Sequence, residues 1–268
     1  MMAVMTAGLT ACGNDSNDEP DNPGGGDVEG ETYTVNGVSF KMVGVEGGTF
    51  TMGATAEQGS DADSEEKPAH EVTLSSFSIG ETEVTQALWQ AVMGSTPSYD
   101  FTGDLNRPVQ WVSWYDCQTF ITKLNEMTGK TFRLPTEAEW EFAARGGNLS
   151  QGYKYSGSNT IGDVAWYRDN SCALGSSHPD YGTHPVGTKA PNELGLYDMS
   201  GNVFEWCQDL YDSYSSSPST NPTGPATGNF RVSRGGNWSS SATCSRVSYR
   251  FILPLDAYFF FLGLRLAL

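Results

Sequence analysis

The first third of the chain carries apolar patterns that predict short strands. Residues 40–45 and 48–53 read as two strands joined by a tight glycine turn, and residues 72–79 read as a third strand. Between them, residues 57–71 are polar and acidic, which predicts a loop. These patterns favour several short elements over one long buried strand.

Helical patterns follow, each with a start and a stop signal. Residues 85–93 predict a short helix that ends at Gly94. A later helix begins at the capping box Thr136-Glu137-Ala138-Glu139 and ends at Gly146-Gly147.

The longest predicted helix lies between these two. Ser113 caps it, Asp116 follows three residues later, and Gly129 ends it. One apolar stripe runs along this helix and consists of Cys117, Phe120, Ile121, Leu124 and Met127.

The pattern changes at the C-terminal end. Residues 262–268 alternate leucine with small or charged residues, which predicts a strand with one buried face. The preceding segment 251–261 holds eight large apolar residues and is interrupted by Pro254 and Asp256, so no regular element is expected there. Because adjacent residues of a strand cannot face one side, the segment predicts a surface that binds a partner. An ordinary apolar core segment is the alternative, and burial decides between them.

Composition and charge narrow the class of protein. The 268 residues include 31 Gly and 13 Pro, which is typical of a loop-rich fold with short elements. The predicted helices all lie before residue 147, and irregular, aromatic-rich sequence follows them, so we expect an α+β domain. The formal net charge of −17 argues against nucleic acid or an anionic membrane surface as the partner. No run of eighteen apolar residues predicts a spanning helix.

The N-terminal residues predict an exported protein. Leu9-Thr10-Ala11-Cys12 resembles the lipobox of bacterial lipoproteins, so residues 1–11 are expected to be a signal peptide and Cys12 the lipidated residue. The first Lys or Arg is residue 41, so the basic start of a signal is missing, which we attribute to a start codon placed too late. A disordered N-terminus with a chance cysteine is the alternative. Residues 12–32 are expected to be a disordered acidic tether before a domain at 33–268.

This acidic stretch after the cysteine resembles those of Bacteroidetes lipoproteins that are exported to the cell surface. The expected location is therefore the outer membrane, with the chain exposed at the surface and held by its lipid alone. The remaining cysteines fit no zinc spacing, and core or loop thiols are expected, with one disulfide left open; they are Cys117, Cys172, Cys207 and Cys244.

Several phrases together resemble the formylglycine-generating enzyme family, also called sulfatase-modifying factor domains. They are Gly47-Gly48-Thr49-Phe50-Thr51-Met52-Gly53, Glu83-Val84-Thr85, Arg107-Pro108-Val109 with Trp114, Arg133 to Glu141, His184-Pro185-Val186-Gly187, Asn192 to Trp206, and Arg234-Gly235-Gly236. The resemblance covers about residues 37–268. It implies a variant of the C-type lectin fold, with few short helices and antiparallel strands.

The resemblance also implies which residues would carry catalysis. Enzymes of this family oxidise a sulfatase cysteine with a copper-binding cysteine pair that follows the Gly-Gly and a serine. Counting without gaps places that serine at Asn237 and the two cysteines at Ser240 and Ser245. Hydroxyls cannot replace thiolates at a copper(I) site, so no copper and no enzyme activity are expected. A formylglycine-generating oxidase with rearranged thiols, using Cys244, is the alternative.

A calcium site is the family feature expected to survive. Asp198, Gly201 and Val203 match a loop that binds the ion through one side-chain oxygen and carbonyls, the ligands that calcium prefers. The alternative is that Asp198 hydrogen-bonds its own turn. The remaining residues of the family phrases have expected structural roles: Trp140, Trp206 and Trp238 as core, Arg234 and Arg265 in ion pairs, and His184 in a loop hydrogen bond.

The C-terminal pattern resembles a non-enzymatic branch of the family, the variable proteins of diversity-generating retroelements. In these, asparagine codons are randomised at their adenines. The residues that fit such codons lie within the segment 237–261, and we expect them to bind the ligand: Asn237, Ser239, Ser240, Ser241, Cys244, Tyr249, Phe251, Ile252, Leu253, Ala257, Tyr258, Phe259, Phe260 and Phe261. The residues between them are expected to be scaffold, among them Arg246, Val247 and Arg250.

We therefore interpret the chain as a surface-displayed binding lipoprotein without catalytic activity. Aromatic residues favour a macromolecular ligand, protein rather than carbohydrate. Two alternatives remain: the oxidase, and a structural envelope component resembling gliding-motility lipoproteins.

Overall fold

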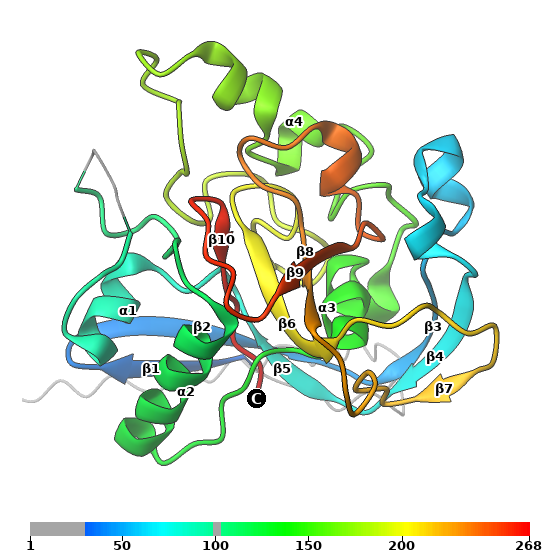
Figure 1. Ribbon diagram of the computed structural model, residues 1–268, viewed down its shortest axis with the longest axis horizontal. Coiled ribbons are helices and arrows are strands. Elements are labelled where there is room, and N and C mark those ends of the chain that lie inside the picture. Colours follow the sequence, from blue (N-terminus) through cyan, green and yellow to red (C-terminus); the bar gives the residue numbers. More distant parts are fainter. Residues whose placement is uncertain (1–29, 99–102) are drawn as a thin grey trace, which may run out of the picture.

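The frame of the molecule is a long ribbon of two antiparallel strands that bends in the middle. The structure, a computed structural model, describes residues 30–98 and 103–268 (Figure 1). Strand β2 (Val38–Val45) pairs with β5 (Phe77–Gly80), and β3 (Gly48–Met52) pairs with β4 (His70–Leu74). Only two residues separate β2 from β3, and two separate β4 from β5, so the ribbon passes from one sheet into the next.

Each half of the ribbon gains a third strand, and a separate sheet carries the C-terminal sequence. Strand β1 (Glu31–Val35) adds to β2, and β7 (Ser219–Thr220) adds in parallel to β4. The four-stranded sheet has the order β10-β6-β8-β9, formed by β6 (Phe204–Leu210), β8 (Phe230–Arg234), β9 (Phe251–Pro254) and β10 (Leu262–Gly263).

The predicted helices are confirmed, because their signals are local. They are α1 (Gln86–Met93), α2 (Trp114–Thr128) and α3 (Glu137–Ala144), followed by the short α4 (Ile161–Val164). The hydroxyls of Thr85, Ser113 and Thr136 accept hydrogen bonds from backbone N–H groups in the first turns, and Gly94 and Gly129 close the first two helices in the left-handed conformation. Met127 is 45% exposed and does not belong to the buried stripe predicted for α2.

Short 3₁₀ turns fill much of the remaining chain. They are Ala56–Asp61, Ser64–Glu66, Gly147–Leu149, Arg168–Asn170, Cys172–Leu174 and Ala242–Ser245. Two of them lie in the predicted acidic loop, where Gln58 and Glu66 are fully buried, so this loop is partly interior.

Three strand predictions need correction. The strands at 40–45 and 48–53 do not pair as a hairpin, because the chain crosses between sheets at Glu46-Gly47. The predicted strand 72–79 is two strands in different sheets. Residues 251–254 form a regular strand at the edge of the C-terminal sheet, although Pro254 predicted an interruption; Pro254 is its last residue, where a proline is tolerated.

The terminal segment 262–268 is buried on both faces rather than one. Its first two residues pair with β6, Leu264 and Leu266 accept hydrogen bonds from Val84 and Gly80, and Ala267 bridges both Ile79 and Arg133. It thus ties the C-terminal sheet to the ribbon.

Two hydrophobic clusters form the core. One fills the space between the β1–β2 sheet, α1 and α2, and the other lies beneath α3 and the bend of the ribbon. Trp140 and Trp206 are fully buried and Trp238 is 6% exposed, which confirms their core role.

The predicted lipidation at Cys12, the signal peptide 1–11 and most of the tether 12–32 lie outside the described residues. Strand β1 begins at Glu31, two residues before the predicted domain boundary. Within residues 30–98 and 103–268, every helix is too short or too polar to cross a membrane.

Candidate binding surface

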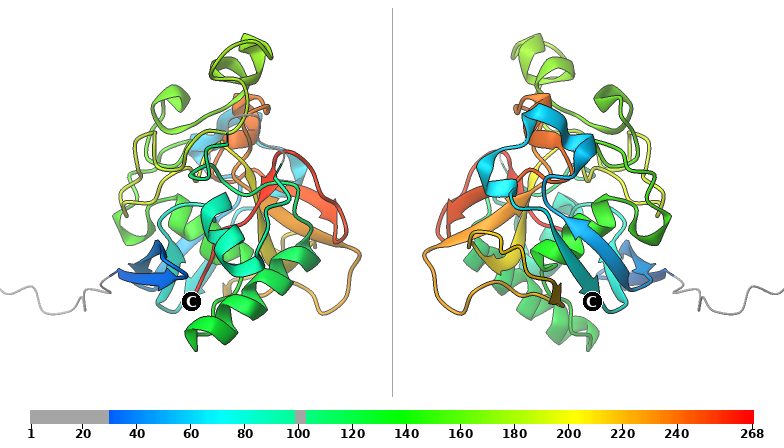
Figure 2. Two further views of the ribbon diagram at one scale, coloured as in Figure 1. Left: turned by 90° about the vertical axis from the view of Figure 1, so that its left-hand side faces the viewer. Right: turned by 90° about the vertical axis from the view of Figure 1, so that its right-hand side faces the viewer.

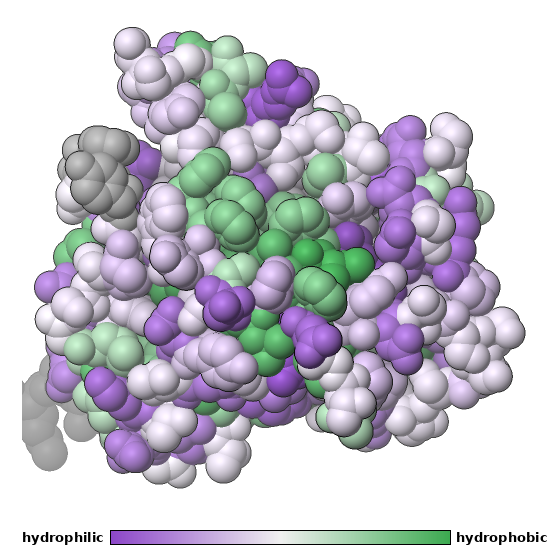
Figure 3. Space-filling view, viewed as in Figure 1, coloured by the Kyte–Doolittle hydropathy of each residue, from purple (hydrophilic) through white to green (hydrophobic). Residues whose placement is uncertain are grey.

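The segment from Phe251 to Phe261 lies at the outer edge of the C-terminal sheet, on the face that Figure 1 turns to the viewer (Figure 2). Side chains of the loop after β9 remain in contact with solvent: Tyr258 is 60% exposed, Phe259 38% and Phe260 37%. Figure 3 shows apolar side chains gathered over this part of the molecule. Folding therefore leaves these three rings of the loop exposed, whereas Leu255, Ala257 and Phe261 are half-buried.

Residues from two other loops extend these rings into one aromatic surface, formed by Trp111, Tyr181, Tyr258, Phe259 and Phe260. The Trp111 ring centroid lies 6.3 Å from that of Tyr258 and 6.1 Å from that of Phe260. Trp238 lies beneath, with its ring centroid 5.5 Å from Phe260 and 5.0 Å from Tyr181, itself 37% exposed. Trp111 and Tyr181 could not be predicted as part of this surface, because no local pattern links them to the C-terminal segment.

The backbone of Trp111 is held in an unfavourable conformation. Its φ of 63° lies in the left-handed region, which bulky residues rarely adopt. Its N–H donates to the Phe259 carbonyl (3.0 Å), so it fixes the loop that carries the exposed rings. Such outliers often occur at functional sites.

The predicted binding residues divide by burial. Ser241 is exposed, as are the rings of Tyr258, Phe259 and Phe260. Eight further predicted residues are half-buried: Ser239, Ser240, Cys244, Tyr249, Phe251, Ile252, Ala257 and Phe261. Two predicted residues are buried and cannot contact a ligand in this conformation. Leu253 packs in the first core cluster, and Asn237 closes a turn by hydrogen-bonding Ser239 and Ser240.

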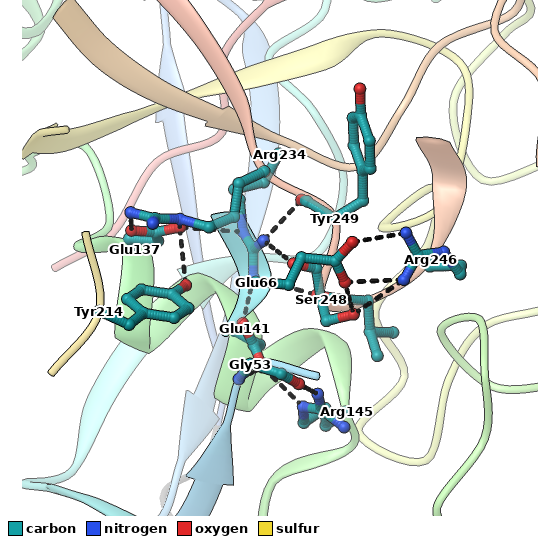
Figure 4. Close-up of polar contacts among 12 residues, drawn as sticks. Gly53, Glu66, Glu137, Glu141, Arg145, Tyr214, Arg234, Arg246, Ser248 and Tyr249 are labelled. Carbon is teal, nitrogen blue, oxygen red and sulfur yellow. Dashed lines mark hydrogen bonds and ion pairs between the residues drawn. The ribbon is translucent and has the colours of Figure 1, made fainter. Parts of the chain in front are cut away.

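A buried ionic network anchors the segment from below (Figure 4). The Arg246 guanidinium binds both carboxylate oxygens of Glu66 (2.6 and 2.7 Å), and Ser248 donates to the same carboxylate. Arg250 binds both oxygens of Glu137 (2.7 Å each).

The two predicted ion pairs are also present and buried. Arg234 pairs with Glu141, and Arg265 binds Glu205 through Nε and a terminal nitrogen (2.7 to 3.0 Å). Arg234 also donates to the carbonyls of Ser248 and Tyr249. Arginines therefore fix both ends of the exposed segment to the scaffold.

Hydroxyls stand at the two positions where counting without gaps from the Gly-Gly places the family's copper-binding thiols. Ser240 is half-buried, and Ser245 is fully buried with an Oγ that has no hydrogen-bond partner. A Cβ added to Gly236, which has a φ of 77°, would lie 2.5 Å from that Oγ, so the Gly-Gly turn packs tightly on it. Cys117, Cys172, Cys207 and Cys244 are not disulfide-bonded. Burial raises the pKa of the Cys117 and Cys207 thiols well above the usual value.

Asp198 has a side-chain oxygen with no partner, as a cation ligand would. Its Oδ2 accepts a hydrogen bond from the Gly187 N–H (2.7 Å), whereas its buried Oδ1 accepts none. It does not bond its own turn. Burial raises its pKa to about 6, and burial with the charges of Asp198 and Glu205 raises the pKa of Glu83 well above its usual range.

Such a cation would depend on backbone oxygens as well as on Asp198. Among the described residues, no three His, Cys, Asp or Glu side chains are grouped so that they could hold a metal. The loop bends at Gly201, which has a φ of 90°. A side chain does not fit there, because a Cβ would lie 2.3 Å from the Trp166 carbonyl oxygen. The Val203 N–H donates to Glu83 (3.0 Å).

His184 has the structural role expected of it. Its Nε2 lies 3.1 Å from the Asp180 carbonyl, and its ring stacks on Trp166 with centroids 3.6 Å apart. Burial lowers its pKa to about 4, so it is neutral at physiological pH.

Comparison with known proteins gives a consistent result. The family described as sulfatase-modifying factor enzyme 1-like domain matches residues 32–268. The chaperone protein LppX of Paenibacillus barcinonensis is 35% identical, over 93% of this chain and 90% of its own. The formylglycine-generating enzyme of Streptomyces coelicolor is 33% identical, over 72% of this chain and 76% of its own.

Two solved structures have the same fold. Treponema denticola variable protein 1 superposes with a TM-score of 0.78 at 36% identity, covering 89% of this chain and 98% of its own. PvdO from Pseudomonas aeruginosa gives 0.70 at 27% identity, covering 85% and 93%. The predicted fold class, an α+β variant with few short helices and mostly antiparallel strands, is confirmed.

Proposed function

Because the chain belongs to the sulfatase-modifying factor enzyme 1-like domain family, we propose that it uses this scaffold for binding, through the aromatic surface, and not for oxidation. The single observation that carries the proposal is the exposure of Tyr258, Phe259 and Phe260 in one loop. Full burial of such a side chain contributes about 1.5–3 kcal/mol, and folding leaves the part of it that belongs to the exposed area of each ring unused. Large aromatic residues around a rigid centre are typical of binding hot spots.

The ligand is a protein in this proposal, because five aromatic rings from three loops offer a broad contact area rather than an enclosed sugar pocket. The similarity to Treponema denticola variable protein 1 supports the further proposal that the segment 237–261 is diversified between copies of the gene. Its exposed positions would then change the ligand, while the buried arginines keep the scaffold constant.

The proposal of a non-catalytic protein rests on the hydroxyls of Ser240 and Ser245. A serine hydroxyl does not supply the soft thiolate ligand that copper(I) prefers. The oxidase remains the second candidate because of the 33% identity to a formylglycine-generating enzyme. A sulfatase peptide incubated with this protein, copper and oxygen should yield no aldehyde, whereas the Streptomyces coelicolor enzyme should yield it. Aldehyde formation that is lost in Cys244→Ser would establish the oxidase instead.

We further propose that a structural calcium ion binds at Asp198, with backbone oxygens around Gly201 and Val203. The unpartnered Oδ1 of Asp198 supports it. Lipidation at Cys12, which would hold the chain at the outer surface of a bacterial outer membrane, is proposed on the sequence alone.

Site-specific photo-crosslinking tests the binding function. Benzoylphenylalanine would replace Tyr258 or, as a control, Tyr115, which is 55% exposed on α2 and whose ring contacts Trp114 instead. On intact cells that display the protein, we expect a discrete protein adduct from position 258 and none from position 115. Adducts at both positions alike, or none at 258, would contradict the proposal.

A further inference from the structure

A cavity lies next to the start of strand β9, apart from the aromatic surface. Its volume is about 380 Å³, and its walls come from the start of α3, the end of β6 and the serine-rich loop 213–225. Arg250 lines it, whereas the next residue, Phe251, stacks on Phe204 and belongs to the other face. The volume is in the range of small-ligand sites.

Asp209 is the unusual residue of this cavity. It is 4% exposed, and its Cβ lies 3.0 Å from where a Gly224 Cβ would stand, so the side chain is between two cavity walls. The Glu137 N–H donates to Oδ2 (2.9 Å). Within the described residues this is the only hydrogen bond to the carboxylate, and Asp209 takes part in no ion pair. A buried carboxylate without a cation is costly, so its retention needs a reason.

The cations near Asp209 donate their hydrogen bonds to other groups, and the buried Nε of Arg231 has no partner. Arg250 uses Nε and one terminal nitrogen on Glu137, and its other terminal nitrogen donates to the carbonyls of Glu65 and Asp212 (3.0 Å each). The Arg231 guanidinium donates to the Gln208 carbonyl and stacks over Trp114.

The rest of the cavity adds acceptors and negative charge. Glu137 has its charge balanced by Arg250 and accepts the Tyr214 hydroxyl (3.0 Å). Asp212 is exposed at the rim, and the ring of His70 packs against Tyr214, with centroids 4.7 Å apart. The hydroxyls of four serines also line the cavity: Ser213, Ser215, Ser217 and Ser219.

We propose that this cavity is a binding site for a primary ammonium group, such as the side chain of a lysine on a partner molecule. The ammonium carries three donors and a positive charge, which match the free Asp209 oxygen, the serine hydroxyls and the uncompensated charge. The Arg250 guanidinium lies over the Tyr214 ring, 3.9 Å from its centroid, and the His70 ring packs against the same side chain, which leaves little of this ring for a sugar to stack on. This site does not depend on the proposed function of the aromatic surface.

Calorimetry at pH 8 with Nα-acetyl-lysine methylamide tests the proposal. We expect saturable binding to the full chain, weakened at least tenfold in Asp209→Asn. Asp169→Asn makes the same charge change on an exposed 3₁₀ turn outside the cavity and should bind like the wild type. Phe260→Ala should also bind like the wild type, which separates this site from the aromatic surface.

The uncharged probe gives a test that needs no variant. The Nε-acetylated form of the same compound should bind the wild-type protein at least tenfold more weakly, so the conclusion stands even if Asp209→Asn folds poorly. No saturable binding of the lysine compound, or equal binding of the acetylated form, would overturn the proposal. Equal binding to folded Asp209→Asn would overturn it as well.

Discussion

Two residues with left-handed backbone angles lie where the proposed function requires them. Trp111 (φ 63°) holds the exposed loop through the Phe259 carbonyl, and Asp198 (φ 57°) points a free carboxylate oxygen into a bent loop. Neither conformation is favourable for these residue types, although aspartate tolerates it better than tryptophan. In the proposed function both strained positions serve binding, of a partner in one case and of a cation in the other.

Calcium should stabilise the protein through Asp198. Ligand at a hundred times its dissociation constant would raise the free energy of unfolding by about 2.7 kcal/mol. The melting temperature measured with calcium should therefore exceed that with a chelator by several degrees, and Asp198→Ala should lose this difference. Magnesium, which prefers a smaller octahedral site, serves as the control ion. An equal calcium response in the variant would contradict the assignment.

The stability of the protein should depend on pH through Asp209. Burial, together with the charge of Glu137, raises its pKa to about 7, whereas an unfolded aspartate has the usual value of 3.8. Between these pH values the folded state therefore binds more protons than the unfolded state. Protonation of Asp209 thus contributes to the free energy of unfolding of the wild type at low pH, and this contribution is lost as pH rises through 7.

Asp209→Asn isolates that effect, because the amide cannot ionise and its oxygen can still accept from Glu137. Denaturant unfolding at pH 5 and pH 8 should show the variant gaining a few kcal/mol relative to the wild type at the higher pH. A constant difference between the two proteins would show that Asp209 keeps a normal pKa.

At the scale of elements, the exposed segment is held in place by buried residues on both sides of it. Arg246 and Arg250 reach Glu66 and Glu137 in distant parts of the chain, and the loop between β9 and β10 is followed by the buried residues 262–267. Surface changes between these anchors should leave the fold intact.

This separation can be measured by unfolding variants of the two kinds. Arg246→Ala leaves the buried Glu66 carboxylate without its cationic partner and should lower the free energy of unfolding by about 3–5 kcal/mol. Ser241→Tyr and Tyr258→Ser, both exposed, should each change it by less than about 1 kcal/mol. Large losses from the two surface variants would mean that the segment is part of the core.

The helices could be predicted from the sequence because their caps are local, as at Ser113 and Thr136. The hairpin at residues 40–53 could not, since a glycine turn does not reveal that the chain enters a second sheet. The alternation of leucine with small or charged residues predicts one buried face for the tail, whereas Glu205 compensates Arg265 in the interior and the other face is buried too.

The candidate site was only partly predictable for a related reason. The exposed rings followed from an apolar mass that no strand could bury on one side, but Trp111 and Tyr181 come from distant loops. Leu253 and Asn237 are predicted ligand-binding residues only because they fit randomised asparagine codons, and a codon carries no information on burial.

For the whole molecule, the buried arginine network and the aromatic surface divide the proposed roles between scaffold and binding. The net charge of −17 disfavours nucleic acid as a partner, and in the proposed function association depends on the aromatic surface. In this account, variation is tolerated only where side chains reach solvent and is excluded where arginines and the tail hold the sheet.

The most direct test is to sequence the 3′ end of the gene and its flanking DNA in many isolates. We expect replacements at exposed or half-buried positions such as Ser241, Tyr258 and Phe260, with Arg246 and Arg250 unchanged and a template repeat beside a reverse transcriptase gene. An invariant 3′ end without a template, or replacements spread evenly over exposed and buried positions, would contradict a diversified binding surface.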